Sequence, residues 1–191
     1  MIDRSTRPEY FERLYTADPD PFGYAISLYE KRKYTATIAG LPRARFRRAF
    51  EIGCSIGVLT RLLAARCGNL LAVDVSQTSL ASARTRCRGV RNVRLRQMLV
   101  PDEWPVETFD LVVLSEVLYY QSARDQRRTL AKTLRSLSAS GVIILVHWLG
   151  ETGTARSGDA AANQFIRQAR RRLHVLSRKR NSQYRLDILA R

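Results

Sequence analysis

The sequence predicts an α/β protein: a Rossmann-like, doubly wound, mostly parallel sheet with a C-terminal antiparallel hairpin and an N-terminal helical cap. Three observations predict this fold class. Apolar segments of strand character alternate with helical segments from residue 49 to residue 170. Several of these strands are continuously apolar, as strands buried on both faces are. Two strand-like pieces joined by a polar turn follow near the end of the sequence.

The composition is that of a globular protein. The 191 residues fit one α/β domain, and a content of 45% hydrophobic and 26% charged residues excludes a disordered chain. The apolar runs are too short to cross a bilayer, and no charged-then-apolar leader opens the sequence. We therefore expect a soluble, cytoplasmic protein with no membrane partner. Its oligomeric state is left open.

The first forty residues predict two helices. Apolar residues recur at helical spacing from Pro8 to Ala17, and the Asp-Pro-Asp-Pro segment that follows breaks the helix, because each proline disfavours helix in the residue before it. A second helix is expected from Phe22 to Leu41, ended by Pro42. We predict a helical cap or lid over residues 1–41, and a Rossmann-like domain over residues 42–191.

The pattern then becomes that of strands and helices in alternation. Its first half is expected to contain strand Ala49–Ile52, helix Val58–Arg66, strand Leu70–Val73 ending at Asp74, a helix capped by Ser76 and running to Arg86, and strand Val93–Arg96.

The second half continues in the same way. It is expected to contain strand Phe109–Leu114, helix Ala123–Leu137 closed by Gly141, strand Val142–Val146, a loop from Gly150 to Gly158, helix Asp159–Arg170, and strands Leu173–Ser177 and Tyr184–Leu189 around the turn at residues 181–183.

The loop after the first strand has the features of a nucleotide site. Gly53 allows a tight turn, and Gly57 allows close approach of the backbone as the next helix begins. Ser55 occupies the place of the middle glycine of a dinucleotide motif, which disfavours NAD. Asp74 ends the next strand 21 residues after Gly53, where a carboxylate can accept protons from both hydroxyls of a ribose.

These residues resemble those of the class I S-adenosylmethionine-dependent methyltransferases. Further motifs narrow the resemblance to the NodS-like branch of that class, whose namesake N-methylates a chitooligosaccharide precursor. They are the Asp-Pro-Asp-Pro-Phe-Gly segment from residue 18, Tyr29-Glu-x-x-Lys-Tyr34, the segment 51–60, Pro-Asp-Glu-Trp-Pro from residue 101, the segment 109–120 with its Ser-Glu-Val-Leu-Tyr-Tyr, and Val-His-Trp from residue 146.

The resemblance implies an S-adenosylmethionine cofactor with S-adenosylhomocysteine as its product. It places Glu51 near the methionine amino group, Asp74 at the ribose and Val75 against the adenine. Residues of the loop after the first strand would line the cofactor, namely Gly53, Ser55 and Gly57.

The resemblance also assigns residues outside that loop. The N-terminal helices would bring Tyr29, Lys33 or Tyr34 near the methionine carboxylate. Ser115 and Glu116, at the end of the fourth strand, would face the sulfonium and the acceptor.

One position departs from the family pattern. Alignment on Pro101 places Leu99 where relatives carry an acid that accepts a hydrogen bond from the adenine amino group. The adenine would keep its packing and backbone bonds but lose one acceptor, which costs roughly 1 kcal/mol. We therefore expect weaker cofactor binding than in the family.

Two side chains at strand ends are candidates for catalysis. An amine must be neutral to attack the methyl group, and a carboxylate or imidazole can remove its proton. We expect Glu116 to position the acceptor and His147 to be an auxiliary base. The alternatives are that Glu116 caps the following turn, and that His147 is a hydrogen-bonded histidine of the core beside Trp148.

The function predicted is N-methylation of a small molecule, amino sugar or oligosaccharide. A net charge of +16 suggests an RNA methyltransferase as an alternative, but no RNA-binding module is recognisable, so nucleic acid is disfavoured. Of the 33 basic residues, four are Lys and 29 are Arg, so Arg-rich coding explains the charge equally well. A second alternative, motivated by Leu99, is a relic that has lost catalysis.

Cysteine usage favours no metal site or disulfide framework. The sequence has three cysteines, an odd number that cannot all pair in disulfides, and no Cys-x-x-Cys motif of the kind that binds zinc. We expect reduced thiols in packed positions and no bound metal.

Overall fold

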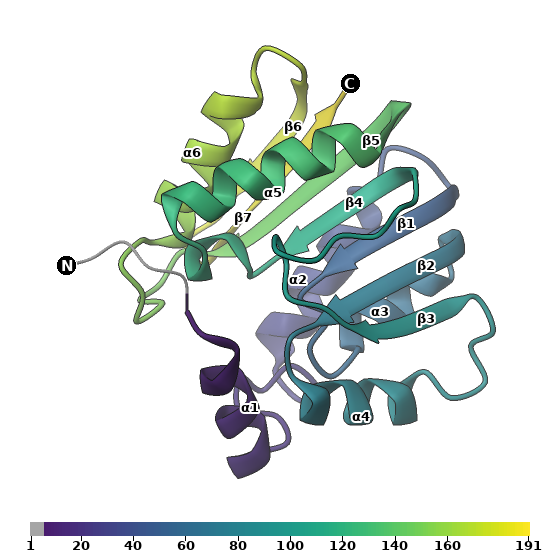
Figure 1. Cartoon of the computed structure of the whole chain (residues 1–191), viewed down its shortest axis with the longest axis vertical. Coiled ribbons are helices and arrows are strands. Elements are labelled where there is room, and N and C mark those ends of the chain that lie inside the picture. Colours follow the sequence, from purple (N-terminus) through teal and green to yellow (C-terminus); the bar gives the residue numbers. More distant parts are fainter. Residues whose placement is uncertain (1–5) are drawn as a thin grey trace. The chain divides into compact units, whose positions relative to one another are not determined.

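The computed structural model describes residues 6–191. The chain forms two compact units, and Figure 1 labels their elements. One unit contains residues 7–99. The other contains residues 100–191 together with the described residue Thr6, whose backbone N–H donates to the carbonyl of Tyr120 over 2.8 Å.

The unit of residues 7–99 is built on three parallel strands. Strand β2 pairs with β1 on one side and with β3 on the other, and Glu51 lies beside Ala72 in the register. The elements are α1 (Pro8–Ala17), α2 (Leu28–Ala39), β1 (Phe46–Ile52), α3 (Val58–Ala64), β2 (Cys67–Asp74), α4 (Gln77–Arg86) and β3 (Val93–Gln97).

The core of this unit lies in its central strands. The segment Leu70–Val73 of β2 and Phe50 of β1 are at most 1% exposed. Burial on both faces explains why these strands lack the polar alternation of a half-exposed sheet. Because the strands are parallel, the loops after β1 and β2 leave the sheet at the same edge.

The unit of residues 100–191 combines parallel and antiparallel pairing. Strands β4 and β5 run parallel, β7 pairs antiparallel with β5, and β6 completes a hairpin with β7. Its elements are β4 (Phe109–Ser115), η1 (Leu118–Tyr120), α5 (Ala123–Ser136), β5 (Leu137–Trp148), α6 (Gly158–Ala169), β6 (His174–Arg180) and β7 (Tyr184–Ala190). The parallel strands with a C-terminal hairpin confirm the fold class predicted from the sequence.

A buried ion network holds the hairpin to α6. The carboxylate of Asp187, fully buried on β7, accepts from Arg185 at 2.7 Å and from Arg178 of β6 at 2.8 Å. Arg185 is itself 2% exposed, and it donates at 2.7 Å to Asp159 in the first turn of α6. Each charge therefore has an opposite partner, as burial of a charge requires.

Several predicted boundaries differ from the structure: β1 begins at Phe46, β5 extends from Leu137 to Trp148, and β6 extends to Arg180. Two other differences have a clear physical reason. The second helix begins at Leu28 and not at Phe22, because the Asp20 carboxylate accepts from the backbone N–H groups of Tyr24 and Ala25 and holds that segment in a turn. Ser27 then caps α2. Gly141 does not close α5, since β5 begins directly at Leu137 and Gly141 lies inside the strand. A Cβ there would lie 2.5 Å from the Leu137 side chain, so packing explains this glycine.

The N-terminal helices belong to the same compact unit as the first three strands. Their separation as a cap over residues 1–41, with a domain over residues 42–191, stays a prediction. Residues 1–5 of the predicted cap lie outside the described residues.

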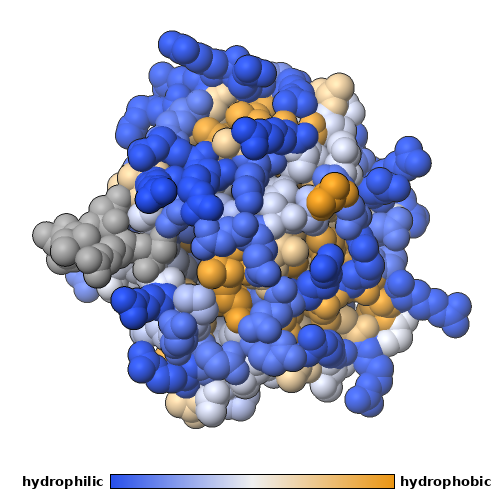
Figure 2. All heavy atoms as spheres, in the orientation of Figure 1, coloured by the Kyte–Doolittle hydropathy of each residue, from blue (hydrophilic) through white to orange (hydrophobic). Residues whose placement is uncertain are grey.

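The surface is mainly hydrophilic on the face shown in Figure 2, where apolar side chains are scattered among polar ones. Among the described helices, none has the length and apolar character needed to span a bilayer.

Gly57 gives a stability prediction. Its φ of +79° disfavours any side chain, and a Cβ would also lie 3.0 Å from the backbone and side chain of Ala83 in α4. Gly89 has a similar φ of +81° but open space around it. We expect Gly57→Ala to lower the free energy of unfolding by about 1–3 kcal/mol more than Gly89→Ala does, in urea titrations. Equal losses would show that the contact with α4 is not the constraint.

Candidate active site

The two loops at the carboxyl end of β1 and β2 are joined by one buried carboxylate. Asp74 ends β2 and is 8% exposed. Its Oδ2 accepts from the backbone N–H of Ser55 at 2.8 Å, and its Oδ1 accepts from the backbone N–H of Ser76 at 3.0 Å. Ser55 lies in the loop after β1, and Ser76 caps α4, so Asp74 fixes both loops.

The loop after β1 has left-handed backbone conformations at three positions. Gly53, Ser55 and Gly57 have φ values of +75°, +49° and +79°. Such conformations are costly for a residue with a Cβ, and in Ser55 the bond to Asp74 offsets that cost. The N–H groups of Gly53 and Cys54 both donate to the carbonyl of Val73. The loop is therefore held by backbone bonds, and this leaves its glycines free to approach a ligand closely.

The carboxylate of Asp74 is surrounded by hydrogen-bond donors. A carboxylate has about four acceptor positions. The N–H groups of Ser55 and Ser76 engage one on each oxygen, and the Ser79 side chain and the Val75 N–H are further donors near this carboxylate. Burial raises its pKa, and hydrogen bonds to the charged form from Ser76 and Ser55 oppose that shift.

Glu51 is a second buried acid in the same unit. It is 1% exposed on β1, and its Oε2 has no hydrogen-bond partner in the described part of the chain. Burial raises its pKa to about 8, and repulsion from Asp74 adds to the shift. The hydroxyl of Thr60, near the carboxyl but short of good hydrogen-bond geometry, opposes it. A cationic ligand group beside Glu51 would relieve this unfavourable burial.

Val75 directly follows β2, and Leu99 lies in the segment after β3. The Gln97 side chain donates to the carbonyl of Val75 at 2.9 Å, and the N–H of Met98 donates to the carbonyl of Asp74 at 3.0 Å. Val75 and Leu99 are half-buried. Leu99 presents an apolar side chain and no acceptor oxygen, as the sequence shows.

Lys33 and Tyr34 lie in α2. Lys33 is 1% exposed, and its ammonium donates to Glu30 at 2.8 Å and lies 5.0 Å from the ring centroid of Tyr29. Tyr34 is buried, with its ring centroid 5.9 Å from the same ammonium. The ammonium is thus held by its own helix, and its approach to a cofactor carboxylate stays a prediction.

Two residues of α1 reach this site although the sequence did not indicate them. The Tyr15 hydroxyl forms a short hydrogen bond with Oγ of Ser55. One turn earlier, the Glu12 carboxylate accepts from both the backbone N–H and the hydroxyl of Thr78 in the first turn of α4. These bonds lower the pKa of Glu12. In the sequence, the signal for such a contact was the position of the acid Glu12 beside the apolar residues of the predicted helix.

The unit of residues 100–191 holds the other predicted residues. Glu116 follows β4 with a φ of +58°, and it is 9% exposed. Its Oε2 accepts from the Tyr119 hydroxyl at 2.8 Å and from the backbone N–H of Trp148 at 2.9 Å. Ser115, the last residue of β4, is 8% exposed and lies beside Val146 in the register. The carboxylate therefore joins the ends of β4 and β5.

His147 belongs to the same cluster. It is fully buried, its Nε2 accepts from the backbone N–H of Leu118 at 3.4 Å, and its ring meets that of Tyr119 edge-on with centroids 5.9 Å apart. An acceptor Nε2 places the proton of the neutral ring on Nδ1. This geometry fits a histidine that orders the turn after β4. Its role as auxiliary base stays a prediction.

The predicted site residues therefore form two clusters, one in each unit. The larger cluster is in residues 7–99 and contains Glu51, Gly53, Ser55, Gly57, Asp74, Val75 and Leu99, with Lys33 and Tyr34 on α2. The cluster in residues 100–191 contains Ser115, Glu116 and His147.

The cysteines are three buried free thiols. Burial raises the pKa of Cys54 well above its ordinary value, which makes it a poor nucleophile at neutral pH. No group of three or more His, Cys, Asp or Glu side chains within residues 6–191 is arranged to bind a metal ion.

Comparisons with known proteins define the class. Residues 49–141 match a family model described as a methyltransferase domain. A putative methyltransferase from Pseudomonas syringae is 34% identical with a TM-score of 0.75, over 86% of this chain and 100% of that one. The N-methyltransferase NodS of Bradyrhizobium japonicum in complex with S-adenosyl-L-homocysteine is 22% identical, with a TM-score of 0.83. The match covers 95% of this chain and 96% of that one. At that identity the likeness establishes the fold, which is the Rossmann-like methyltransferase fold.

The curated relatives give the family. Nodulation protein S of Bradyrhizobium diazoefficiens is 30% identical over 159 residues, which are 83% of this chain and 76% of that protein. The chain belongs to the NodS-like family of class I methyltransferases. It spans 57% and 58% of the length of the nodulation S proteins of Sinorhizobium fredii and Rhizobium tropici.

Glu51 gives a pH prediction. Its pKa of about 8 lies above the ordinary value of 4.5, so between these values the folded protein binds more protons than the unfolded chain. The contribution of Glu51 to the free energy of unfolding is therefore fully present below pH 4.5 and is lost as the pH rises through about 8. In urea titrations of the cofactor-free wild-type protein, we expect the free energy of unfolding to decline with rising pH by up to about 1.4 kcal/mol per pH unit. Glu51→Gln should remove this decline.

The matched control is Glu9→Gln, an exposed acid of α1, which should leave that decline unchanged. A decline that persists in Glu51→Gln would show that another group titrates.

Proposed function

We propose that the protein is an S-adenosylmethionine-dependent N-methyltransferase acting on an amine of a small molecule, amino sugar or oligosaccharide. The observation that carries this proposal is Asp74. It is a buried carboxylate at the end of β2 that fixes the loops after β1 and β2 through two backbone bonds, and we assign the ribose diol to its oxygens.

The rest of the loop fits the same cofactor. Gly53 and Gly57 carry no side chain, so a ligand can approach the backbone closely there, and the Ser55 hydroxyl is held by Tyr15. Glu51 is a buried acid with an unpartnered oxygen within the described residues, and the ammonium of the methionine moiety is a group that would stabilise its charged form. We assign Val75 to the adenine, and we expect Leu99 to weaken binding by supplying no acceptor.

S-adenosylmethionine supplies an activated methyl group, so the protein has to orient the acceptor and receive its proton. We assign the orientation to Glu116, with Ser115 beside it. The carboxylate of Glu116 is held by Tyr119 and Trp148 and therefore has one defined direction. We assign the receipt of the amine's proton to the Glu116 carboxylate. His147, which keeps the turn after β4 in place through Leu118, is assigned the role of auxiliary base.

An amine acceptor is supported by the family, because the related NodS protein of Bradyrhizobium japonicum is an N-methyltransferase. An RNA substrate and a relic without catalysis are the competing outcomes. The intact Asp74 and Glu51 speak against a relic.

The first test is cofactor binding measured by isothermal titration calorimetry. We expect one site per chain, which binds either S-adenosylmethionine or S-adenosylhomocysteine. Asp74→Asn should weaken both by about tenfold or more, because hydrogen bonds to a charged acceptor are worth about 1.5–3 kcal/mol.

The matched control is Asp18→Asn, an exposed acid of the same unit whose amide oxygen can still accept the N–H of Asp20. Circular dichroism of each variant separates loss of affinity from loss of fold. Absence of binding in the wild-type chain would refute the proposal.

The second test concerns Glu116 and follows a screen of amines and amino sugars for formation of S-adenosylhomocysteine. On the acceptor that this screen identifies, Glu116→Gln should keep both hydrogen bonds through its amide oxygen but remove the charge. We expect kcat to fall by about tenfold or more while the Kd of the cofactor stays within about twofold.

Tyr119→Phe is the control, since it removes one hydrogen bond and keeps the carboxylate. Full turnover by Glu116→Gln would exclude the proposed role.

A further inference from the structure

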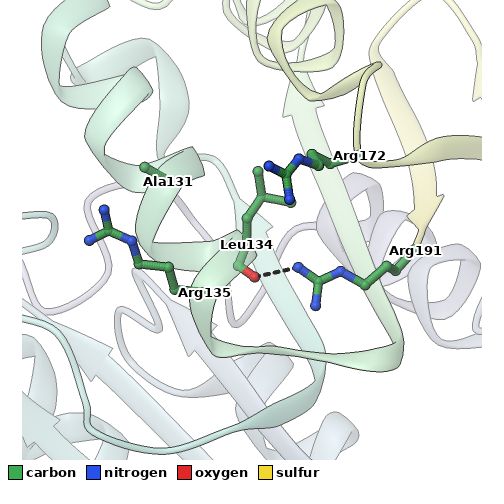
Figure 3. Close-up of a pocket in the computed structure, with 5 residues that line it drawn as sticks. All are labelled: Ala131, Leu134, Arg135, Arg172 and Arg191. Atoms are coloured by element: carbon green, nitrogen blue, oxygen red, sulfur yellow. Dashed lines mark hydrogen bonds between the residues drawn. The ribbon is translucent and has the colours of Figure 1, made fainter.

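A groove lined by arginines lies in the unit of residues 100–191, and neither the family nor the proposed reaction accounts for it. Its volume is about 410 Å³, a size that accommodates small ligands. It is lined by Ala131, Leu134, Arg135, Arg172 and Arg191 (Figure 3), which come from α5, from the segment after α6 and from the residue after β7.

The arginines occupy both walls of this groove. In Figure 3, Arg172 and Arg191 lie on one side of Leu134, and Arg135 extends from α5 on the other. Arg191 is oriented by two hydrogen bonds, to the carbonyls of Leu137 at 2.8 Å and of Leu134 at 2.7 Å. These carbonyls belong to the C-terminal end of α5 and the start of β5, so one wall is fixed by the fold.

The charge of the groove is uncompensated. Within residues 6–191, the guanidinium groups of Arg135 and Arg172 have no ion pair or hydrogen bond, and Arg191 contacts neutral carbonyls. None of the lining side chains is a carboxylate. This differs from the hairpin of the same unit, where Arg178 and Arg185 share Asp187. Like charges around one groove are favoured when an anion lies among them.

The groove is remote from the proposed catalytic residues of its own unit. Arg191 binds the carbonyl of Leu137, the first residue of β5, and His147 lies ten residues further along the same strand. At roughly 3.3 Å per residue this separation is about 30 Å. The groove therefore does not hold the reacting amine, and its ligand is a separate one.

We propose that this groove is a binding site for a phosphate group. A guanidinium donates paired hydrogen bonds to phosphate oxygens, and a phosphate has enough charge and acceptors to engage more than one of the lining arginines, whereas a carboxylate offers two oxygens. The apolar floor of Ala131 and Leu134 would accommodate the group to which the phosphate is attached. The site does not depend on the proposed methyl transfer.

The test is calorimetric titration of the cofactor-free chain with inorganic phosphate in a phosphate-free buffer. The double variant Arg135→Gln/Arg172→Gln should bind phosphate about tenfold or more weakly than wild type, because charge-assisted bonds are lost. Both side chains are exposed, so the fold should persist, and thermal unfolding checks this.

The matched control is Arg127→Gln, an exposed arginine eight residues earlier on α5 that does not line the groove. It changes the net charge without touching the site, and its effect should stay within about twofold. Arg135→Lys/Arg172→Lys keeps the charge but removes the paired donors, and it should give an intermediate affinity.

Two outcomes would overturn the proposal. One is that the wild-type chain does not bind phosphate. The other is that the loss of phosphate affinity per removed charge is no greater in the double variant than in Arg127→Gln. A parallel titration with a single-stranded oligonucleotide identifies the source of the phosphate. A selective loss of oligonucleotide binding in the double variant indicates a phosphodiester backbone. Unchanged oligonucleotide binding, with loss of inorganic phosphate, indicates a small phosphorylated ligand.

Discussion

The buried carboxylate of Asp74 is the contact on which the candidate cofactor site depends. It terminates β2 and accepts from backbone N–H groups in two loops, so a single side chain sets the conformation of Ser55 and the start of α4. In the loop after β1, Ser55 has a left-handed backbone, and a Cβ at Gly57 would lie 3.0 Å from Ala83 of α4. Helix α1 then adds contacts to the same two loops through Tyr15 and Glu12. The acid that would receive the ribose is thus also the structural centre of its unit.

The other unit uses the same principle at the end of β4. Glu116 has a left-handed backbone, and its carboxylate accepts a backbone N–H from the neighbouring strand β5 and a hydroxyl from η1. In both units an acid at the carboxyl end of a parallel strand bonds to backbone, and the strand end is rigid as a result. Rigid strand ends suit a reaction in which the protein contributes mainly orientation. Rigidity also explains why the strained backbone of Ser55 and Glu116 is tolerated at these strand ends.

Much of the fold could be predicted from local patterns. Continuous apolar runs identified β2 and β4, and Ser76 correctly marked the start of α4, because periodicity and capping are encoded by neighbours in sequence. The apolar periodicity places the start of α2 at Phe22, so the observed start was missed although Ser27 and Glu30 form a capping-box pattern that marks it. Gly141 resembled a helix terminus, although its reason is packing against Leu137. The contact between Tyr15 and Ser55 joins residues 40 positions apart, and no local pattern indicates it.

The burial of Lys33 has a practical consequence for chemical modification. The chain has four lysines, and Lys33 is 1% exposed and paired with Glu30, whereas Lys31 and Lys179 are exposed and Lys132 is half-buried. An amine-directed reagent would therefore modify the other three first. Acylation of Lys33 requires α2 to detach from its surroundings, so its rate would report the opening of that helix. The scarcity of lysine in an arginine-rich chain thus provides an internal label for the motion of one element.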